Sequence, residues 1–360
     1  MTWNRSTGAS RTKLNDDRFM TFHIGILGGG NISKTHARAA RAIDGVEIAA
    51  VCGQNVEKVN RLAEACGCVA YQDLEAFLNH KPMEIVLIGS PSGLHAEQGI
   101  RAARRRLHVL VEKPIDITAE RADLLIAACE EARVKLGVFF QDRVAADIIK
   151  LKELLDAGKL GKPMLVTAQV KWYRPPEYYK DSRWRGTWAL DGGGALMNQG
   201  IHTVDLLLWL LGDVSAVSAK AVTLLHDIEV EDAVAATLEF ASGAICTIEA
   251  STSVYPGYPR RLELTGSEGT IILENDRITS ANLRTPLPES TSEQVSSKDE
   301  RSVSPTISNA RGHQKIIEDF LRAIATGGVP LCDGHQARRS VKLICAVYES
   351  SRTGQRVMIQ

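Results

Sequence analysis

The sequence contains no apolar segment long enough to cross a membrane, no surplus of either charge and no regular spacing of cysteines. The run Leu206–Leu211 comes nearest to a spanning helix, which needs about 20 apolar residues. The 43 basic and 43 acidic side chains among 360 residues give a formal net charge of zero. A long basic stripe is also missing, which argues against a nucleic-acid-binding surface. We therefore expect neither a membrane nor a nucleic acid as partner.

The seven cysteines are odd in number and scattered, mostly within apolar segments. Such thiols are typical of a reduced, cytoplasmic protein. Cys66 and Cys68 are too close together for a zinc knuckle, and no second pair follows at ligand spacing. We expect no metal site. Residues 1–20 are polar and basic without an apolar core, so we expect a disordered tail and not a secretory signal.

A glycine-rich turn follows the first apolar strand, which we expect at His23–Leu27. In a dinucleotide-binding fold, the first glycine of such a turn makes the bend, the second admits the diphosphate and the third sets helix packing. Gly28 and Gly30 occupy the first two places, and the small residue Ser33 occupies the third. The helix expected at Lys34–Ile43 would offer its N-terminal amides to the anion. Taken by itself, the pattern is equally consistent with an ordinary turn.

The next strand, expected at Glu47–Cys52, arrives at the spacing that the dinucleotide fingerprint requires. Its end reads Gly53-Gln54-Asn55. An acidic residue would hold the ribose of NAD there, and an arginine would attract the phosphate of NADP, but the segment has neither. The choice between NAD and NADP stays open, with NAD favoured.

A third strand, Ile85–Ile88, ends in a segment that contains Ser90, Pro91 and His95. Ligands of open parallel sheets lie outside such carboxyl ends. His95 is equally consistent with a residue that caps or lines the following helix. The expected cofactor-binding residues are Gly28, Gly30, Asn31, Ile32, Gln54, Ser90, Pro91, His95, Glu112 and Lys113.

Strand and helix signals alternate as far as about Gln141, which predicts a parallel sheet covered on both faces. Residues 21–142 are therefore expected to form a Rossmann dinucleotide-binding domain. Residues 143–360 are expected to form an α/β domain for substrate binding and oligomerisation, on a mostly antiparallel, open-faced sheet. The fold class is thus α/β plus α+β. The expected strands of the second sheet are Pro163–Trp172, Val214–His226, Asp232–Phe240, Ala244–Thr252, Arg260–Gly266 and Gly269–Glu274.

The free face of the second sheet suggests pairing of subunits into a homodimer or homotetramer. Residues from about 285 to 308 are rich in Ser, Glu, Pro and Thr and are expected to form a surface loop. Two closing helices, Gly312–Ala325 and Gln336–Arg352, are expected to return apolar faces to the core.

Two short segments carry the chemistry. Glu112-Lys113-Pro114 follows an apolar run that reads as a buried parallel strand. A second segment, Gly192–Asp205, is a glycine turn entering a helix on which Asn198, His202 and Asp205 would share one face, at i, i+4 and i+7. A lysine and a histidine beside a nicotinamide could remove a proton from an alcohol while its carbon gives up hydride.

Each of these residues also has a plainer interpretation. A lysine at a strand end is ordinarily a solvated charge, and a buried helical histidine often satisfies a backbone group. Asn198, His202 and Asp205 have a spacing possible for metal ligands, but an amide is a weak ligand and stronger partners are not evident.

Together, the glycine turn, Glu112-Lys113-Pro114, the helix with Asn198 and His202, and the antiparallel second domain resemble the Gfo/Idh/MocA family of sugar and inositol oxidoreductases. The resemblance covers the chain from about Phe22 to its end. Within the family, residues 184–205 are most similar to the nucleotide-sugar 3-dehydrogenases that act on UDP-N-acetylglucosaminuronate. Asn198 departs from the pattern, because many members have an aspartate there.

The resemblance implies NAD(P)-dependent hydride transfer to or from a secondary hydroxyl of a sugar, inositol or nucleotide-sugar. His202 would accept the hydroxyl proton, Lys113 would stabilise the alkoxide, and Asn198 would hold a neighbouring hydroxyl. Asp205 would set the histidine tautomer or cap a helix. The bond between Lys113 and Pro114 is often cis in the family.

An aromatic and arginine-rich segment, which includes Tyr173–Tyr179 and Arg183–Arg185, precedes the second glycine turn. Aromatic faces suit stacking on a sugar or base, and arginines suit a carboxylate or diphosphate. Arg185 is the expected anion clamp, and a subunit interface or a self-packed lid is the alternative. The expected substrate-binding residues are Lys113, Arg185, Asn198 and His202. Two other functions stay open, a redox-neutral NAD-dependent glycosidase of the same fold and a non-catalytic NAD(P)-binding regulator.

Overall fold

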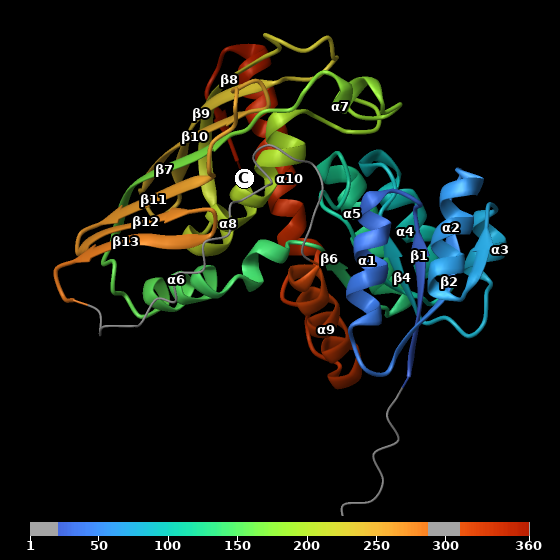
Figure 1. Cartoon of the computed structure of the whole chain (residues 1–360). Helices are drawn as coiled ribbons and strands as arrows, with labels where there is room; N and C mark the ends of the chain where they lie inside the picture. The colour runs from blue at the N-terminus through green and yellow to red at the C-terminus, as the bar shows by residue number, and fades with distance from the viewer. Residues whose placement is uncertain (1–20, 287–309, 360) are drawn as a thin grey trace, which may run out of the picture.

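The computed structural model describes residues 21–286 and 310–359, which form two β-sheets with their helices (Figure 1). The expectations for residues 1–20, and for nearly all of the loop from 285 to 308, fall outside the described residues. None of the described helices is both long enough and apolar enough to span a bilayer.

The N-terminal sheet has six parallel strands in the order β3-β2-β1-β4-β5-β6. The order reverses between β1 and β4, and in such sheets this reversal opens a crevice at the carboxyl ends of the strands. Strand β4 reads Ile-Val-Leu-Ile and is buried throughout, as expected for a sheet covered on both faces. The strands are β1 (Phe22–Leu27), β2 (Val46–Cys52), β3 (Val69–Tyr71), β4 (Ile85–Ile88), β5 (His108–Val111) and β6 (Leu136–Val138).

Helices cover both faces of this sheet. Three of them begin at a side chain that accepts a hydrogen bond from the first turn, namely Asn55, Asp73 and Thr118, and such caps stabilise helix N-termini. The helix that follows β1 has Gly30 at this place, without a side-chain cap. The helices are α1 (Asn31–Arg41), α2 (Val56–Cys66), α3 (Leu74–Leu78), α4 (His95–Arg104) and α5 (Ala119–Ala132).

The second sheet has eight strands in the order β13-β12-β11-β7-β10-β9-β8-β14. Its pairs are antiparallel except for β7 and β10, which run parallel because β7 lies between the two groups of hairpins. The prediction missed the edge strands β13 and β14. It also missed the position of β7 between β11 and β10. The strands are β7 (Pro163–Lys171), β8 (Val214–Val222), β9 (Ala233–Phe240), β10 (Ile245–Ser251), β11 (Arg261–Gly266), β12 (Gly269–Glu274), β13 (Arg277–Leu283) and β14 (Val357–Met358).

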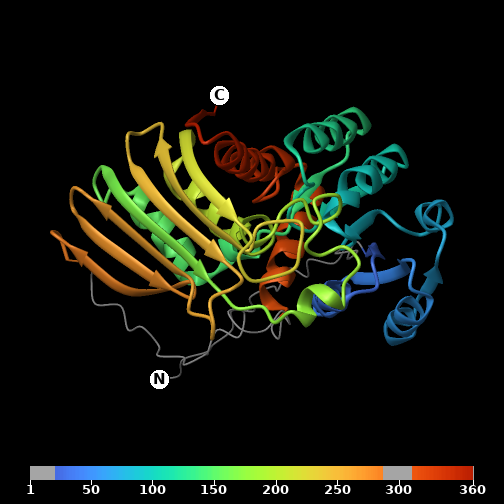
Figure 2. The same ribbon diagram turned by 90° about the horizontal axis from the view of Figure 1, so that it is seen from above.

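Helices α6, α8 and α10 pack on one face of the second sheet, and no helix of the described residues covers the opposite face (Figure 2). Helix α8 is buried along nearly its whole length, which explains why it reads as almost continuously apolar. The Rossmann domain and the mostly antiparallel, open-faced second sheet are therefore confirmed. The remaining helices are α6 (Ala146–Asp156), α7 (Glu177–Lys180), α8 (Ile201–Leu211), α9 (Arg311–Thr326) and α10 (Gly334–Thr353).

Helix α9 belongs to the end of the chain but completes the core of the N-terminal sheet. Its residues Ile316 and Phe320 share one apolar cluster with Ile85 and Leu87 of β4. It also packs beside α1, as Figure 1 shows. This helix therefore ties the C-terminal segment to the nucleotide-binding half.

Candidate active site

The turn after β1 leaves room for a ligand against its backbone. Gly28 has φ +129°, and a Cβ there would lie 2.6 Å from Ser33 Oγ and 2.7 Å from the Gly89 carbonyl oxygen. A Cβ on Gly30 would meet nothing within 4 Å. Among the described residues, no partner forms a hydrogen bond with the buried Ser33 hydroxyl. A bare turn that leads into the N-terminus of α1 fits the diphosphate of a dinucleotide.

The other expected cofactor residues with accessible side chains surround this turn. Strands β1, β2 and β4 are neighbours, so their carboxyl ends meet at one edge of the sheet. Gln54 follows β2 and is exposed, whereas Ser90 and Pro91 follow β4 and are half-buried. Asn31 is exposed, and Ile32 is half-buried in the first turn of α1.

Two expected cofactor residues use their polar atoms within the protein. His95 is 1% exposed, with Nδ1 2.8 Å from the Pro114 carbonyl oxygen and Nε2 2.9 Å from the Ser90 carbonyl oxygen. Glu112 is also buried, and its carboxylate contacts two histidines. His95 therefore ties two strand-end loops together.

Lys113 lies at the end of β5 and reaches across to the second glycine turn. The bond between Lys113 and Pro114 is cis, and Lys113 Nζ donates a hydrogen bond of 2.9 Å to the Asn198 carbonyl oxygen. Burial lowers the pKa of the Lys113 ammonium, while the nearby carboxylates, including Glu112, act in the opposite direction. The structure thus brings Lys113 and Asn198 together, although they are 85 residues apart in sequence.

His202 lies near the start of α8, opposite a carboxylate that we did not single out. Its Nδ1 is 3.8 Å from Asp142 Oδ2, and its ring meets Phe140 edge-on. Asp142 also accepts a hydrogen bond of 2.7 Å from Arg260 Nη1, and Arg260 forms an ion pair with Asp276. The charge of Asp142 also raises the pKa of the Lys113 ammonium, which burial lowers.

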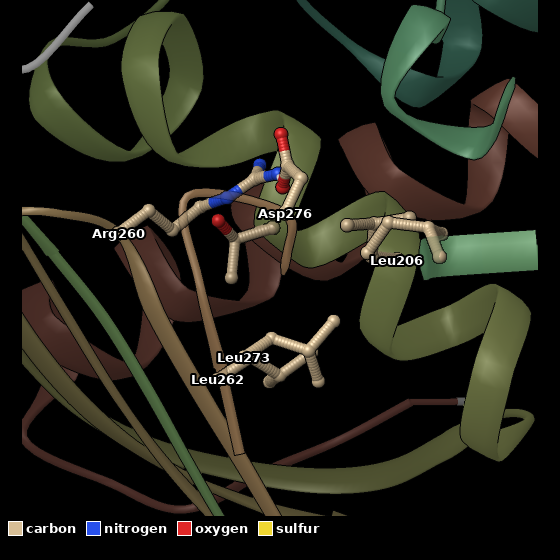
Figure 3. Close-up of a pocket in the computed structure, with 7 residues that line it drawn as sticks. Leu206, Arg260, Leu262, Leu273 and Asp276 are labelled. Carbon is tan, nitrogen blue, oxygen red and sulfur yellow. The ribbon is translucent and has the colours of Figure 1, made fainter. Parts of the chain in front are cut away.

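Figure 3 shows the pocket that continues behind this ion pair, with Arg260 and Asp276 together on one side and Leu206, Leu262 and Leu273 on the other. The apolar side chains and the position between α8 and the sheet make it part of the core. The structure therefore supports Arg260 as a buried link between the β12–β13 turn and Asp142.

Asn198 does not sit in a regular α-helix. Residues Ala195–Gly200 form a π-helical turn, and α8 begins only at Ile201. The even i, i+4, i+7 face predicted for this segment is therefore wrong, because the π turn changes the register of Asn198 relative to His202. The Asn198 amide donates a hydrogen bond of 2.7 Å to Asp191, whose second oxygen accepts from the Gly186 amide. Burial raises the pKa of the Asp191 carboxyl to about 6.

Asp205 lies inside α8 and not at a helix end, so it does not cap a helix. It forms a two-bond ion pair with Arg143, at 2.7 and 2.8 Å, and both side chains are 1% exposed. Arg143 also donates to the Leu331 carbonyl oxygen and to Gln336. This pair therefore links α8 to the segment that precedes α10 and to the first turn of α10.

The arginine and aromatic segment folds over the second glycine turn. Arg185 stacks on Tyr178, with its guanidinium carbon 4.4 Å from the ring centroid, and lies 5.1 Å from the Trp184 centroid. The guanidinium carbon of Arg174 also lies near this ring, 5.6 Å from the Tyr178 centroid. The hydroxyl of Tyr178 accepts a hydrogen bond from Gln199. Among the described residues, none accepts a hydrogen bond from the buried Arg185 Nε.

Glu231 was also missed by the sequence analysis. It accepts hydrogen bonds of 2.8 and 2.9 Å from the Gly194 and Leu196 amides and one of 2.9 Å from the Tyr348 hydroxyl. Burial raises the pKa of the Glu231 carboxyl to about 7. The N-terminal amides of the second turn are therefore occupied by a residue of the protein itself.

Comparison with known proteins gives consistent results for both halves of the chain. Residues 22–140 match the profile described as oxidoreductase family, NAD-binding Rossmann fold, and residues 148–272 match the GFO/IDH/MocA C-terminal domain. The inositol 2-dehydrogenase of Rhizobium meliloti is 30% identical over 74% of this chain and 79% of its own length. The D-xylose 1-dehydrogenase (NADP(+)) 2 of Haloferax volcanii is 29% identical over 92% of this chain and 98% of its own length.

A solved structure agrees with these relatives. The WlbA dehydrogenase from Bordetella pertussis, in complex with NADH and UDP-GlcNAcA, is 31% identical and superposes with a TM-score of 0.84, covering 94% of this chain and 99% of its own. The family resemblance drawn from the motifs is thereby confirmed. The chain belongs to the Gfo/Idh/MocA family of oxidoreductases.

Proposed function

We propose that this protein is an NAD(P)-dependent dehydrogenase that transfers hydride between the nicotinamide and a secondary hydroxyl of a sugar, with a nucleotide-linked sugar acid as substrate. The observation that carries the proposal is the hydrogen bond of 2.9 Å between Lys113 Nζ and the Asn198 carbonyl oxygen in the second glycine turn, with His202 Nδ1 3.8 Å from Asp142 Oδ2. Family membership and NADH in a related structure support it over a redox-neutral glycosidase or a regulator.

The division of labour follows from the charges of the site. The bound nicotinamide supplies the hydride acceptor or donor. His202 accepts the hydroxyl proton, and the Asp142 carboxylate that faces Nδ1 stabilises the resulting imidazolium. The Lys113 ammonium stabilises negative charge on the reacting oxygen in a largely buried site. Asn198 orients a neighbouring hydroxyl, held in place by its hydrogen bond to Asp191.

The aromatic and arginine segment supports a nucleotide-linked acid as substrate. Arg185 combines a flat guanidinium stacked on Tyr178 with a buried Nε that has no hydrogen-bond partner among the described residues. Such a group suits a carboxylate or diphosphate. The related WlbA structure holds UDP-GlcNAcA. A neutral polyol is the second candidate, because the Rhizobium relative is an inositol 2-dehydrogenase.

The first experiment measures NADH and NADPH formation from UDP-sugar acids, neutral sugars and inositols. Lys113→Ala should lower turnover by about 100-fold or more, a far larger effect than its effect on NADH binding, which a fluorescence titration measures. Lys159→Ala, a change at an exposed lysine after α6, is the matched control. Near-full activity of Lys113→Ala would refute the role of the lysine. Turnover of inositols alone would favour the second candidate, and cofactor binding without any turnover would favour the regulator or the redox-neutral enzyme.

Arg185 gives a separate test of the substrate class. Arg185→Lys keeps the positive charge but loses the planar, two-bond geometry, so it should raise KM for a UDP-sugar acid more than for a neutral sugar. An equal effect on both substrates would place Arg185 outside the anion site.

We also propose that the protein works in the cytoplasm and assembles into dimers or tetramers through the open face of the second sheet. Leu165 of β7 and Ile245 of β10 are paired neighbours and are 55% and 47% exposed. Leu224 and Leu225, at the β8–β9 connection, are also exposed. Light scattering on the purified chain tests the assembly, and Leu165→Lys together with Ile245→Lys should yield monomers.

A further inference from the structure

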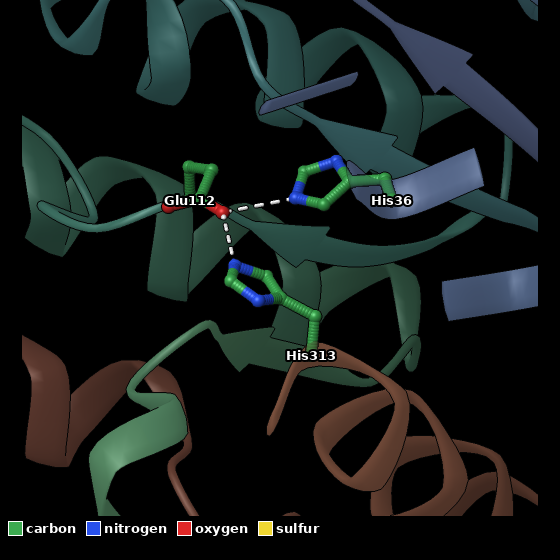
Figure 4. Close-up of side chains that lie close together, drawn as sticks. All are labelled: His36, Glu112 and His313. Carbon is green, nitrogen blue, oxygen red and sulfur yellow. Dashed lines mark hydrogen bonds and ion pairs between the residues drawn. The ribbon is translucent and has the colours of Figure 1, made fainter. Parts of the chain in front are cut away.

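Glu112, the residue before the expected catalytic lysine, lies buried between three segments that are far apart in sequence. Its Oε1 is 2.9 Å from His36 Nε2 and 3.4 Å from His313 Nε2. Its Oε2 accepts a hydrogen bond of 3.2 Å from the Lys113 backbone N–H. Figure 4 shows both imidazoles converging on the one carboxylate. Glu112 therefore joins the histidines directly to the backbone of Lys113.

The two histidines are held firmly on their own helices. His36 lies on α1, has no exposed surface and stacks on Phe139 with ring centroids 4.4 Å apart. His313 lies in the first turn of α9, is 2% exposed and packs 5.3 Å from the same ring. Because α9 is part of the apolar core of the N-terminal sheet, its position fixes that of His313.

The cluster places one buried carboxylate against two imidazoles. Burial by itself would raise the pKa of the Glu112 carboxyl, but its interactions with His313 and His36 bring that pKa well below its ordinary value. Burial lowers the pKa of the His36 imidazole, against the opposing effect of Glu112 and with small contributions from His313 and His95. A buried anion therefore persists beside Lys113.

Lys113 experiences this anion together with the other charges around it. Burial lowers the pKa of its ammonium, and Glu112, Asp191 and Asp142 raise it, in that order, while Arg185 lowers it. Among these groups, Glu112 is the one that also binds the Lys113 backbone. The same side chain thus acts on the position and on the charge of the lysine.

We propose that His36 and His313 are positioning residues for Lys113, because they hold the Glu112 carboxylate where it anchors the lysine backbone. The proposal rests on the proposed function for its catalytic consequence, but its physical content does not need a substrate. Helix α9, from the far end of the chain, thereby becomes part of the active-site support.

The test is a titration of Lys113 in the full-length protein without cofactor. Lysine amines are reductively methylated with carbon-13 formaldehyde and followed by NMR as the pH rises, and Lys113→Arg assigns the Lys113 resonance. Glu112→Gln should lower the pKa of Lys113 by about one unit. His313→Leu should lower it by less, and His313→Gln, which keeps an N–H donor, should restore it. His335→Leu, at an exposed histidine that pairs with Glu130, is the matched control.

The outcomes separate positioning from mere stability. If His313→Leu lowers the melting temperature but leaves the Lys113 titration unchanged, the cluster is only structural and the proposal is wrong. A stoichiometric divalent metal in the purified protein that is lost in His313→Leu would also overturn it, because the histidines would then be ligands. The proposed function is decided separately by NADH formation, and there His313→Leu should lower kcat with little change in KM.

Discussion

The two glycine-rich turns of this chain look alike in sequence but differ in what fills the space beside them. At the first, a Cβ on Gly30 would meet nothing within 4 Å, and α1 begins there without a side-chain cap. At the second, a Cβ on Gly194 would overlap the Glu231 carbonyl oxygen. The Glu231 carboxylate accepts hydrogen bonds from the Gly194 and Leu196 amides. The first turn leaves space for a ligand, whereas the space beside the second turn is filled by Glu231 of the protein itself.

The difference shows that a glycine-rich helix start is not by itself an anion site. The amides at any helix N-terminus need acceptors, and those of the second turn are satisfied by Glu231 from a distant loop. This internal carboxylate leaves the second turn to present side chains and the Asn198 carbonyl oxygen to Lys113. Backbone recognition and side-chain chemistry are thus assigned to separate turns.

The largest effect is expected from Gly194→Ala. Its Cβ would collide with the backbone of Glu231, which cannot move without breaking the hydrogen bonds that it makes. We expect a loss of about 4 kcal/mol or more in the free energy of unfolding, measured by urea denaturation. Gly30→Ala is the matched control and should unfold like the wild type. Equal stability of the two variants would remove the distinction between the turns.

Glu231→Gln should change how stability depends on pH. Burial raises the pKa of Glu231 from 4.5 to about 7, so the folded state binds a proton that the unfolded state releases between these values. The stability that this group contributes is therefore present below the unfolded-state pKa of 4.5 and is lost as the pH rises through the folded-state pKa of about 7. Between about pH 5 and about pH 8, the wild type should lose roughly 3 kcal/mol more than the variant.

Urea denaturation of the two proteins at both pH values measures this difference. Glu229→Gln, at a nearby exposed glutamate, is the control and should behave like the wild type. Parallel pH profiles for the wild type and Glu231→Gln would show that the carboxylate is ionised throughout, with the second turn bound to a permanent anion.

Gly30→Ala should weaken cofactor binding and leave the stability of the fold unchanged. Its backbone is compatible with alanine, since φ is −83°, but the methyl group would project toward the space that we assign to the diphosphate. We expect NADH to bind about tenfold more weakly, equivalent to about 1.4 kcal/mol, in a fluorescence titration. Unchanged affinity would place the diphosphate away from this turn.

The sequence predicted the first turn and the place of Lys113 after a buried strand, because both depend on local patterns. Glycine spacing after an apolar strand marks a turn, and parallel strands bring their carboxyl ends to one edge. Asp142 was missed although it comes shortly after β6, at the same edge, so the signal existed. Glu231 carried no such signal, because it meets Gly194 across 37 residues through tertiary packing.

The register around Asn198 was also beyond sequence reasoning. The i, i+4 argument assumes a regular helix, and the π-helical turn Ala195–Gly200 breaks that assumption. Packing selects this turn. Glu231, which accepts a hydrogen bond from the Tyr348 hydroxyl, binds the start of the turn, and Lys113 binds the Asn198 carbonyl oxygen. The parallel pairing of β7 with β10 was missed for a similar reason, because alternation along a strand does not name its neighbour.

The smallest effect is expected at Gln54, which lies exposed at the end of β2 beside the first turn. A carboxylate there would repel the additional phosphate of NADPH but accept hydrogen bonds from the ribose of NADH. Gln54→Asp should therefore weaken NADPH binding relative to NADH by about fivefold, because an exposed charge interaction contributes about 1 kcal/mol. Parallel fluorescence titrations at low and high salt measure the ratio, and salt should reduce it if charge is the cause. A ratio that does not change would mean that the ribose lies beyond the reach of Gln54, and cofactor choice would then depend on other residues around the turn.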